Sequence, residues 1–190
     1  MSSTALLVID IQRGAFDGVR CPPIDAAERF VGNAQLLVEA ARAGGHPIVF
    51  VQHCESDPRA PFEEGSVHWQ LHESLQPQGE RESTLRKYAF SAFENTDLDA
   101  RLKAQGLTDL VICGLQSEYC VSHATQSALQ LGYRVQLAQD GHSTWPTEEQ
   151  GPAEIRDQVN ATLAAAGASL ASSAELAARL AKAKQDAVTS

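Results

Sequence analysis

The sequence predicts an α/β fold in which a mostly parallel six-stranded sheet is covered by helices on both faces, a three-layer αβα architecture. Two observations predict this fold. Short apolar runs alternate along the chain with segments whose apolar residues recur at helical spacing. The apolar runs lack polar–apolar alternation, which is typical of parallel strands that are buried on both faces. A chain of 190 residues is expected to form one domain over residues 1–190.

The first part of the chain predicts strand, helix and strand in that order. Residues 5–9 form an apolar run that ends at Asp10. Residues 25–43 carry apolar side chains at helical spacing and stop at Gly44, a C-cap signal for a helix. The next apolar run, residues 47–52, predicts the second strand.

A long irregular segment follows, and then strands and helices alternate again. Residues 54–83 are rich in Pro, Gly and charge, with one short helical turn expected over 67–71; a loop of this length inside a compact domain is usually functional. The remaining apolar runs predict strands over residues 84–87, 109–113, 133–138 and 168–170. The intervening segments predict helices over residues 98–104, 118–131, 152–166 and 174–183.

Composition excludes several classes of protein. The net charge of −9, from 15 Lys and Arg against 24 Asp and Glu, argues against non-specific nucleic-acid binding, which needs a basic surface. The N-terminal segment has no basic region or cleavage-site pattern, so no signal peptide is expected. No apolar stretch approaches the ~20 residues of a membrane span, so no membrane partner is expected. The four cysteines include no C-x-x-C pair and are expected to be free thiols in a cytoplasmic protein.

The candidate functional residues lie where the predicted strands end. Ligands of parallel sheets bind beyond the carboxyl ends of the strands. That rule selects Asp10, His53, Lys87, the turn from Gly114 to Cys120, and the segment Asp140-Gly141-His142.

Cys120 is the most informative of these residues because it lies in the first turn of a predicted helix, directly after a Gly-containing turn. A helix N-terminus lowers a cysteine pKa, and its free N–H groups can hold an oxyanion. Thiolate attack on a carbonyl also needs a base and a cation that favours the charged sulfur. Alone, Asp10 is an ordinary cap, Lys87 a solvated side chain and Cys120 a packed thiol. Their convergence at three strand ends predicts a catalytic set of Asp10, Lys87 and Cys120.

Several of these segments, in this order and spacing, resemble the isochorismatase-like cysteine hydrolases over nearly the whole chain. The matching segments are Leu6–Gln12, Arg86–Phe93, Val111–Val121 and Gln139–Thr144. The resemblance implies a Rossmann-like fold and a catalytic triad of Asp10, Lys87 and Cys120. It also implies a cis peptide bond between Leu115 and Gln116, with the N–H groups of Gln116 and Cys120 forming an oxyanion hole. A homodimer or homotetramer is a further implication.

Two branches of that family differ from this sequence. Isochorismatases, which cleave a vinyl ether, lack the nucleophilic cysteine, so Cys120 places the chain with the amide-cleaving branch. Nicotinamidases carry a metal-binding Asp-x-His motif after the second strand, whereas here residues 52–57 are Gln-His-Cys-Glu-Ser-Asp. Two of the remaining histidines, His68 and His72, are four residues apart, but two histidines without a third spaced ligand make a poor zinc site. No metal and no cofactor are therefore expected.

The expected partner is a small molecule held by side chains on the loops at the predicted active edge. An aromatic-walled pocket with few polar groups suits a small planar or apolar acyl group. The predicted substrate-binding residues are Phe16, His53, Trp69, Tyr119 and His142. Packing between loops is an equally open interpretation for Trp69, Phe93 and Trp145.

The leading hypothesis is a metal-independent cysteine hydrolase that cleaves a C–N bond of a small molecule through a thioester on Cys120. Three alternatives stay open: an isochorismatase-type hydrolase of another small substrate, a thiol-based redox protein, and a non-catalytic binding protein. The presence of all three candidate catalytic residues counts against the last.

Overall fold

The computed structural model describes residues 3–182 as a six-stranded parallel sheet with the strand order β3-β2-β1-β4-β5-β6. The strands are β1 (Thr4–Ile9), β2 (Ile48–His53), β3 (Glu82–Lys87), β4 (Asp109–Leu115), β5 (Arg134–Ser143) and β6 (Ser169–Ala171). The helices are α1 (Ala27–Gly44), α2 (Leu98–Ala104), α3 (Ser122–Gln130), α4 (Pro152–Ala165) and α5 (Ser173–Lys182). Two short helical turns, η1 (Arg13–Ala15) and η2 (Ser117–Val121), follow β1 and β4.

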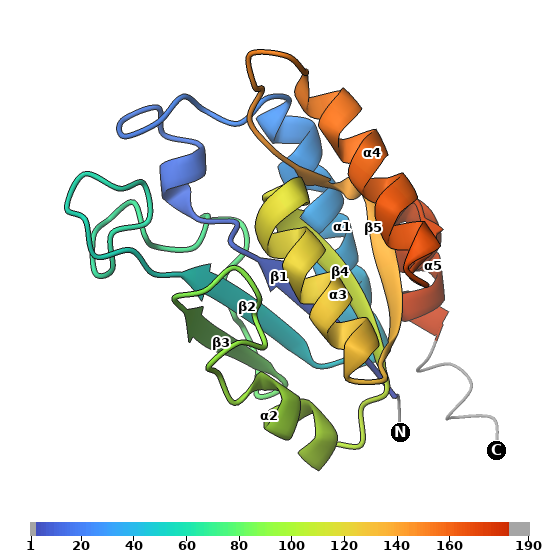
Figure 1. Ribbon diagram of the computed structural model, residues 1–190. Coiled ribbons are helices and arrows are strands. Elements are labelled where there is room, and N and C mark those ends of the chain that lie inside the picture. The colour runs from blue at the N-terminus through green and yellow to red at the C-terminus, as the bar shows by residue number, and fades with distance from the viewer. Residues whose placement is uncertain (1–2, 183–190) are drawn as a thin grey trace, which may run out of the picture.

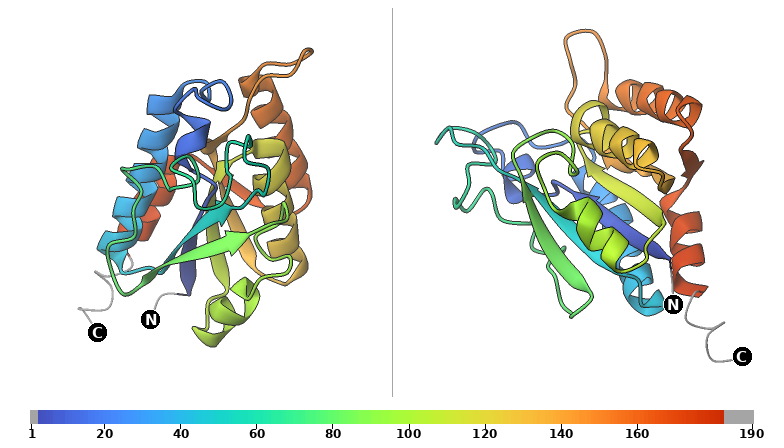
Figure 2. Two further views of the ribbon diagram at one scale, coloured as in Figure 1. Left: turned by 90° about the vertical axis from the view of Figure 1, so that its left-hand side faces the viewer. Right: turned by 60° about the horizontal axis from the view of Figure 1, so that its bottom comes forward.

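Helices cover both faces of the sheet, so the predicted three-layer fold is confirmed (Figures 1 and 2). Leu6 and Val8 of β1 pack into the core beneath α1 and α5, while Leu7 and Ile9 pack into the core beneath α2, α3 and α4. All four side chains are fully buried. The strand is apolar throughout because both of its faces are covered.

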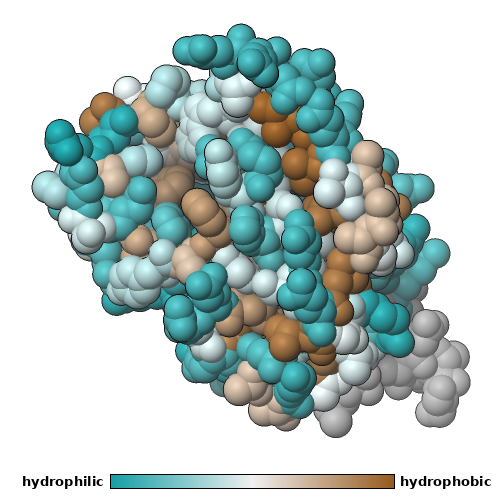
Figure 3. Space-filling model, viewed as in Figure 1, coloured by the Kyte–Doolittle hydropathy of each residue, from teal (hydrophilic) through white to brown (hydrophobic). Residues whose placement is uncertain are grey.

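The surface is consistent with this burial. On the face seen in Figure 3, hydrophilic residues predominate and hydrophobic residues show mainly in a narrow band. No helix among residues 3–182 is long and apolar enough to cross a membrane.

The strand order places a crevice at the centre of the sheet. From β1 the chain builds outward through β2 and β3 and then returns to β4 on the other side of β1. Such a reversal leaves a binding crevice beyond the carboxyl ends of the two central strands. The long loops gather at this end of the molecule (Figure 1).

Some elements differ from the sequence-based expectation. β5 continues five residues beyond the expected end at Ala138, because a register shift opposite β4 lets His142 and Ser143 pair with Gly114 and Leu115. Residues 67–71 form turns and one bridge instead of a helical turn, and the helix expected from residue 118 begins as the π-helical turn η2. The last helix was expected to reach residue 183, which lies outside the described range.

Candidate active site

Three side chains from separate strand ends meet in the crevice. The Nζ atom of Lys87, the last residue of β3, lies 2.8 Å from Oδ2 of Asp10, which follows β1. The same Nζ lies 3.1 Å from Sγ of Cys120, which lies in η2 after β4. The exposed fractions are 2% for Asp10, 0% for Lys87 and 7% for Cys120, so this ion pair is shielded from bulk water.

Backbone geometry at the ends of β1 and β4 brings the two sides of the site together. Asp10 has a φ of 53°, in the left-handed region that Asp tolerates better than most residues. Gly114 of β4 pairs with Ile9, and a Cβ at Gly114 would lie only 2.1 Å from the carbonyl oxygen of Ile9. Glycine is therefore required for this close approach. The peptide bond that follows, between Leu115 and Gln116, is cis, as the resemblance implies.

The Lys87 ammonium also fixes the state of His53. Besides Asp10 and Cys120, its Nζ contacts the carbonyl oxygen of Ala89 at 3.1 Å and Nδ1 of His53 at 3.2 Å. An ammonium donates only, so Nδ1 of His53 accepts and the ring proton lies on Nε2. Burial, and then the Lys87 charge, lower the pKa of His53, which keeps its ring neutral.

The charge on Lys87 is maintained by its partners. Burial by itself would lower the pKa of Lys87, but the negative charge of Asp10 and the hydrogen bonds to Asp10 and Cys120 outweigh it, so the pKa is raised. Lys87 is therefore a permanent cation at the base of the site.

The Cys120 thiol is protonated at rest, which differs from the expectation that the helix start would lower its pKa. Burial raises the pKa of Cys120 to about 12, the Asp10 charge adds to the rise, and Lys87 opposes it. Ionisation therefore needs a base beside the sulfur. Oδ1 of Asp10 is buried and has no hydrogen-bond partner among the described residues, so it is available to accept a proton.

A cavity of about 840 Å³ opens above these residues. Asp10 and Cys120 line it together with His53 and Gln116. The other walls come from the loops after β1, β2, β3 and β5, and include Asp25, Glu55, Phe62, Phe90 and Trp145. The indole N–H of Trp145 donates to the carbonyl oxygen of Pro22, which fixes one wall against another.

Similarity to known proteins shows the family of this chain. Residues 4–175 match the model of the isochorismatase domain. The chain belongs to the isochorismatase family. It is 35% identical to a streptothricin hydrolase from Streptomyces noursei over 86% of this chain, but it spans only 57% of that protein's length.

Solved structures of isochorismatase-family proteins share the fold. An isochorismatase from Pseudomonas putida superposes with a TM-score of 0.83 and 29% identity, covering 91% of this chain and 89% of the other. N-carbamoylsarcosine amidase from Thermoplasma acidophilum superposes with a TM-score of 0.72 and 25% identity, covering 90% of this chain and 96% of the other. The solved structures that share the fold of this isochorismatase-family chain thus include one that is named as an amidase.

Of the five residues predicted to bind substrate, the structure places only His53 on the cavity of this isochorismatase-family site. Phe16 stacks with Phe30 and packs edge-on against His72. Trp69 lies under the guanidinium of Arg86, 4.9 Å from the ring centre. Tyr119 is 44% exposed and packs on the wall residue Phe90, with ring centres 5.3 Å apart. Loop packing accounts for Phe16 and Trp69, and the helical turn of η2 points Tyr119 outward.

His142 lies behind the nucleophile turn instead of on the cavity wall. Its Nδ1 is 2.8 Å from the hydroxyl of Ser117, and its Nε2 is 3.0 Å from Oδ1 of Asn160. The amide nitrogen of Asn160 donates to Gln139, so Oδ1 is the acceptor and Nε2 of His142 carries the proton. Ser117 begins η2, so His142 supports the turn that holds Cys120.

Stability should depend on the protonation of His142. Burial lowers the pKa of His142 to about 4, below the value of about 6.5 expected in the unfolded chain. The neutral ring is therefore favoured by folding, and its contribution is complete above pH ~6.5 and is lost as the pH falls toward 4. We expect the unfolding free-energy difference between wild type and His142→Gln to shrink by about 3 kcal/mol from pH 7 to pH 4. Denaturant unfolding measures it, and a difference that stays constant with pH contradicts the assignment.

The other histidines do not gather around a metal position. His68 pairs with Asp17, and Nδ1 of His72 contacts the hydroxyl of Ser74. Within residues 3–182, no group of three or more His, Cys, Asp or Glu side chains is arranged to hold a metal ion.

Most of the residues that form the cavity walls are not among the site residues predicted from the sequence. Glu55 lies two residues beyond the end of β2, and Phe90 lies three residues beyond the end of β3. The rule that ligands bind beyond strand ends therefore selects both when it includes the first three residues after each strand. Asp25 begins the segment expected to be helical and Phe62 lies in the irregular segment 54–83, and no sequence pattern indicates that either residue reaches the cavity.

Proposed function

We propose that this protein is a cysteine hydrolase that cleaves the C–N bond of a small amide, with Asp10, Lys87 and Cys120 as its catalytic residues. One observation carries the proposal: the Lys87 ammonium contacts both the Asp10 carboxylate and the Cys120 sulfur at the wall of a cavity. The names of two similar proteins, N-carbamoylsarcosine amidase and streptothricin hydrolase, support hydrolysis of this general kind.

The first half of the mechanism forms a thioester. Asp10 takes the thiol proton as the Cys120 sulfur attacks the carbonyl carbon of the amide. The N–H groups of Gln116 and Cys120 stabilise the oxyanion that forms. Lys87 stays charged and stabilises the thiolate as it develops.

The second half releases both products. Asp10 passes its proton to the departing amine as the C–N bond breaks, which leaves an acyl thioester on Cys120. Asp10 then takes a proton from water as the water attacks the thioester carbonyl. The carboxylic acid leaves, and the proton returns to the Cys120 sulfur.

The test combines an ammonia-release screen over small amides with intact-mass spectrometry of rapidly quenched protein. We expect an adduct with the mass of the acyl group, located on Cys120. Cys21 provides the matched control because it is a free thiol that lines the same cavity. A Cys21→Ala variant should keep the adduct and the ammonia release, whereas an adduct located on Cys21 contradicts the mechanism.

Thiol redox chemistry has weaker support. Redox-active cysteines react as accessible thiolates. Burial raises the pKa of Cys21 and of Cys54, as it does for Cys120, and Cys54 is buried outside the cavity lining. A low-pKa thiol with a second reactive cysteine beside it is therefore not the arrangement observed.

A further inference from the structure

The charged side chains that line the cavity are all acidic. Apart from Asp10, which Lys87 neutralises, they are Asp25 and Glu55. No lysine or arginine of residues 3–182 contributes to the lining. With the Cys120 thiol protonated, Asp25 and Glu55 supply the uncompensated charge of the cavity.

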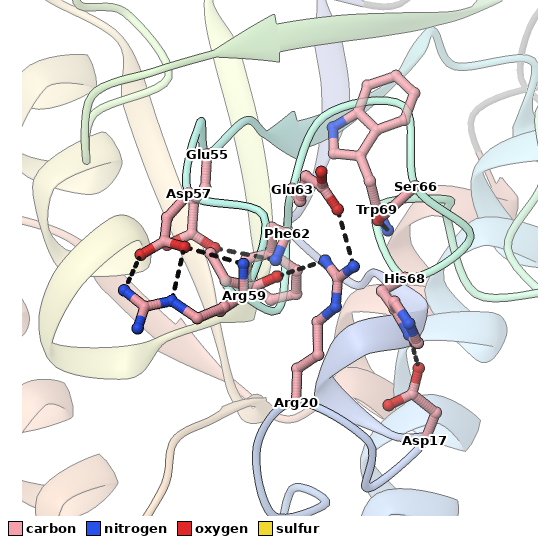
Figure 4. Close-up of polar contacts among 11 residues, drawn as sticks. Asp17, Arg20, Glu55, Asp57, Arg59, Phe62, Glu63, Ser66, His68 and Trp69 are labelled. Atoms are coloured by element: carbon pink, nitrogen blue, oxygen red, sulfur yellow. Dashed lines mark hydrogen bonds and ion pairs between the residues drawn. The ribbon is translucent and has the colours of Figure 1, made fainter.

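Glu55 is held in place by the backbone of its own loop. Its Oε2 accepts a hydrogen bond of 2.9 Å from the N–H of Phe62 (Figure 4). Two backbone hydrogen bonds of 3.0 Å each, from Glu55 N–H to the Phe62 carbonyl and from Glu64 N–H to the Glu55 carbonyl, form a parallel bridge between Glu55 and Glu63 that fixes the same loop. The carboxylate is therefore preorganised at the cavity wall without a counter-ion.

The arginines around this loop are paired with other carboxylates. Arg20 contacts Glu63 at 2.7 Å, and Arg59 contacts Asp57 at 3.0 Å (Figure 4). Arg86 contacts Glu64 at 3.0 Å. Among the described residues, Glu55 has no ion-pair partner, and Asp25 makes neither an ion pair nor a hydrogen bond. The negative charge at the cavity is thus not neutralised from within the chain.

Two other features indicate that a ligand completes this cavity. Oδ1 of Asp10 lies in a side chain that is only 2% exposed, and it has no partner among the described residues. The walls also contain the aromatic rings of Phe62, Phe90 and Trp145, whose faces attract cations.

We propose that the substrate of this site is a cationic amide, whose protonated or quaternary amine lies against Glu55, Asp25 and the aromatic wall while its carbonyl lies at Cys120. The position of the carbonyl rests on the proposed function, whereas the charge preference rests on the cavity itself. A substrate with a carboxylate in the same place would meet two unpaired negative charges and no cation on the wall.

Alkylation of Cys120 tests the charge preference without any hydrolysis. Three alkyl bromides of similar reach carry different charges: (2-bromoethyl)trimethylammonium, 2-bromoethanol and 2-bromoethanesulfonate. In each reaction an S–C bond forms at Cys120, bromide leaves, and the thiol proton passes to Asp10 or water. Rates are measured by mass spectrometry of the Cys120 peptide and divided by the rates with free 2-mercaptoethanol. We expect the normalised rate to be highest for the cationic bromide, intermediate for the neutral one and lowest for the anionic one.

Removing one carboxylate should weaken that preference. In Glu55→Gln the amide oxygen can still accept from Phe62 N–H, so only the charge is lost. We expect the cation-to-neutral rate ratio to fall about fivefold in Glu55→Gln, since a partly exposed ion pair contributes up to about 1 kcal/mol. The fall should be smaller in Asp25→Asn, because Asp25 is exposed and water screens its charge. The matched control is Glu80→Gln, which removes the same charge at the opposite end of β3, and should leave the ratio unchanged.

The outcomes separate this inference from the proposed function. Equal normalised rates for the three bromides, or a cation preference that Glu55→Gln and Asp25→Asn leave intact, overturns the inference.

A second experiment compares ammonia release from the cationic 4-aminobutanamide, the neutral pentanamide and the anionic glutaramate. If Cys120 is alkylated fastest by the cationic bromide but none of the amides is hydrolysed, the proposed function is contradicted and the cationic ligand stays supported. Hydrolysis that favours glutaramate would contradict the cationic ligand and leave the proposed function supported.

Discussion

Replacing Cys120 with alanine is expected to lower kcat for the amide substrate by about 10⁴- to 10⁶-fold, because removing the nucleophile leaves only the oxyanion donors and substrate binding. The sulfur lies at the cavity wall in contact with Lys87, and an alanine methyl cannot form a thioester. Steady-state ammonia release measures the loss, with circular dichroism and the unfolding midpoint reporting the fold.

Two further variants sharpen this result. Cys120→Ser keeps the size of the side chain, but its hydroxyl is much harder to ionise than the thiol, so we expect a loss nearly as large. Cys21→Ala changes a different thiol of the same cavity and should keep most of the activity. Substantial turnover by Cys120→Ala would rule out the thioester mechanism.

Replacing Lys87 with methionine is expected to lower the free energy of unfolding by about 3–5 kcal/mol, because it leaves the buried Asp10 carboxylate without a counter-ion. Lys87 is fully buried and Asp10 is 2% exposed, so water cannot screen the remaining charge. Methionine keeps the length of the side chain, which limits the loss of packing. Denaturant unfolding at neutral pH measures the change. The variant should also lose activity, since the thiolate would form without a stabilising cation.

A double variant distinguishes the charge effect from a packing effect. Lys87→Met combined with Asp10→Asn removes both charges, so it should be more stable than Lys87→Met alone. If the double variant is instead less stable by the sum of the two single changes, the electrostatic explanation is wrong.

The fold and the meeting of Asp10, Lys87 and Cys120 could be predicted because both depend on local signals. Apolar runs mark the strands, and each of these three residues lies at or after a strand end, which a parallel sheet brings to one edge. The extent of β5 could not be predicted, because its last residues, Gln139–Ser143, are largely polar or small and resemble a loop.

The cavity walls could not be predicted for a different physical reason. They come from irregular loops, whose paths depend on contacts between distant segments, such as the hydrogen bond from Trp145 to Pro22. Aromatic character alone does not distinguish residues that line the cavity from residues that pack between loops. Trp145 lines the cavity, whereas Phe16 and Trp69 pack elsewhere. The raised pKa of Cys120 was missed because the degree of burial is a tertiary property.

The four contacts of Lys87 exceed what one ammonium can satisfy, since Nζ carries three protons. In the resting site the protonated sulfur is the weakest acceptor of the four, and the carboxylate of Asp10 is the strongest. When the proton moves from Cys120 to Asp10 in the proposed mechanism, the thiolate becomes a stronger acceptor than the protonated carboxyl group. Nζ can then shift its hydrogen bonds toward the sulfur. The negative charge then passes between two neighbours of one stationary cation. The buried ion pair thus needs no counter-ion from solvent during the cycle, and His53 on the cavity wall accepts from the same ammonium.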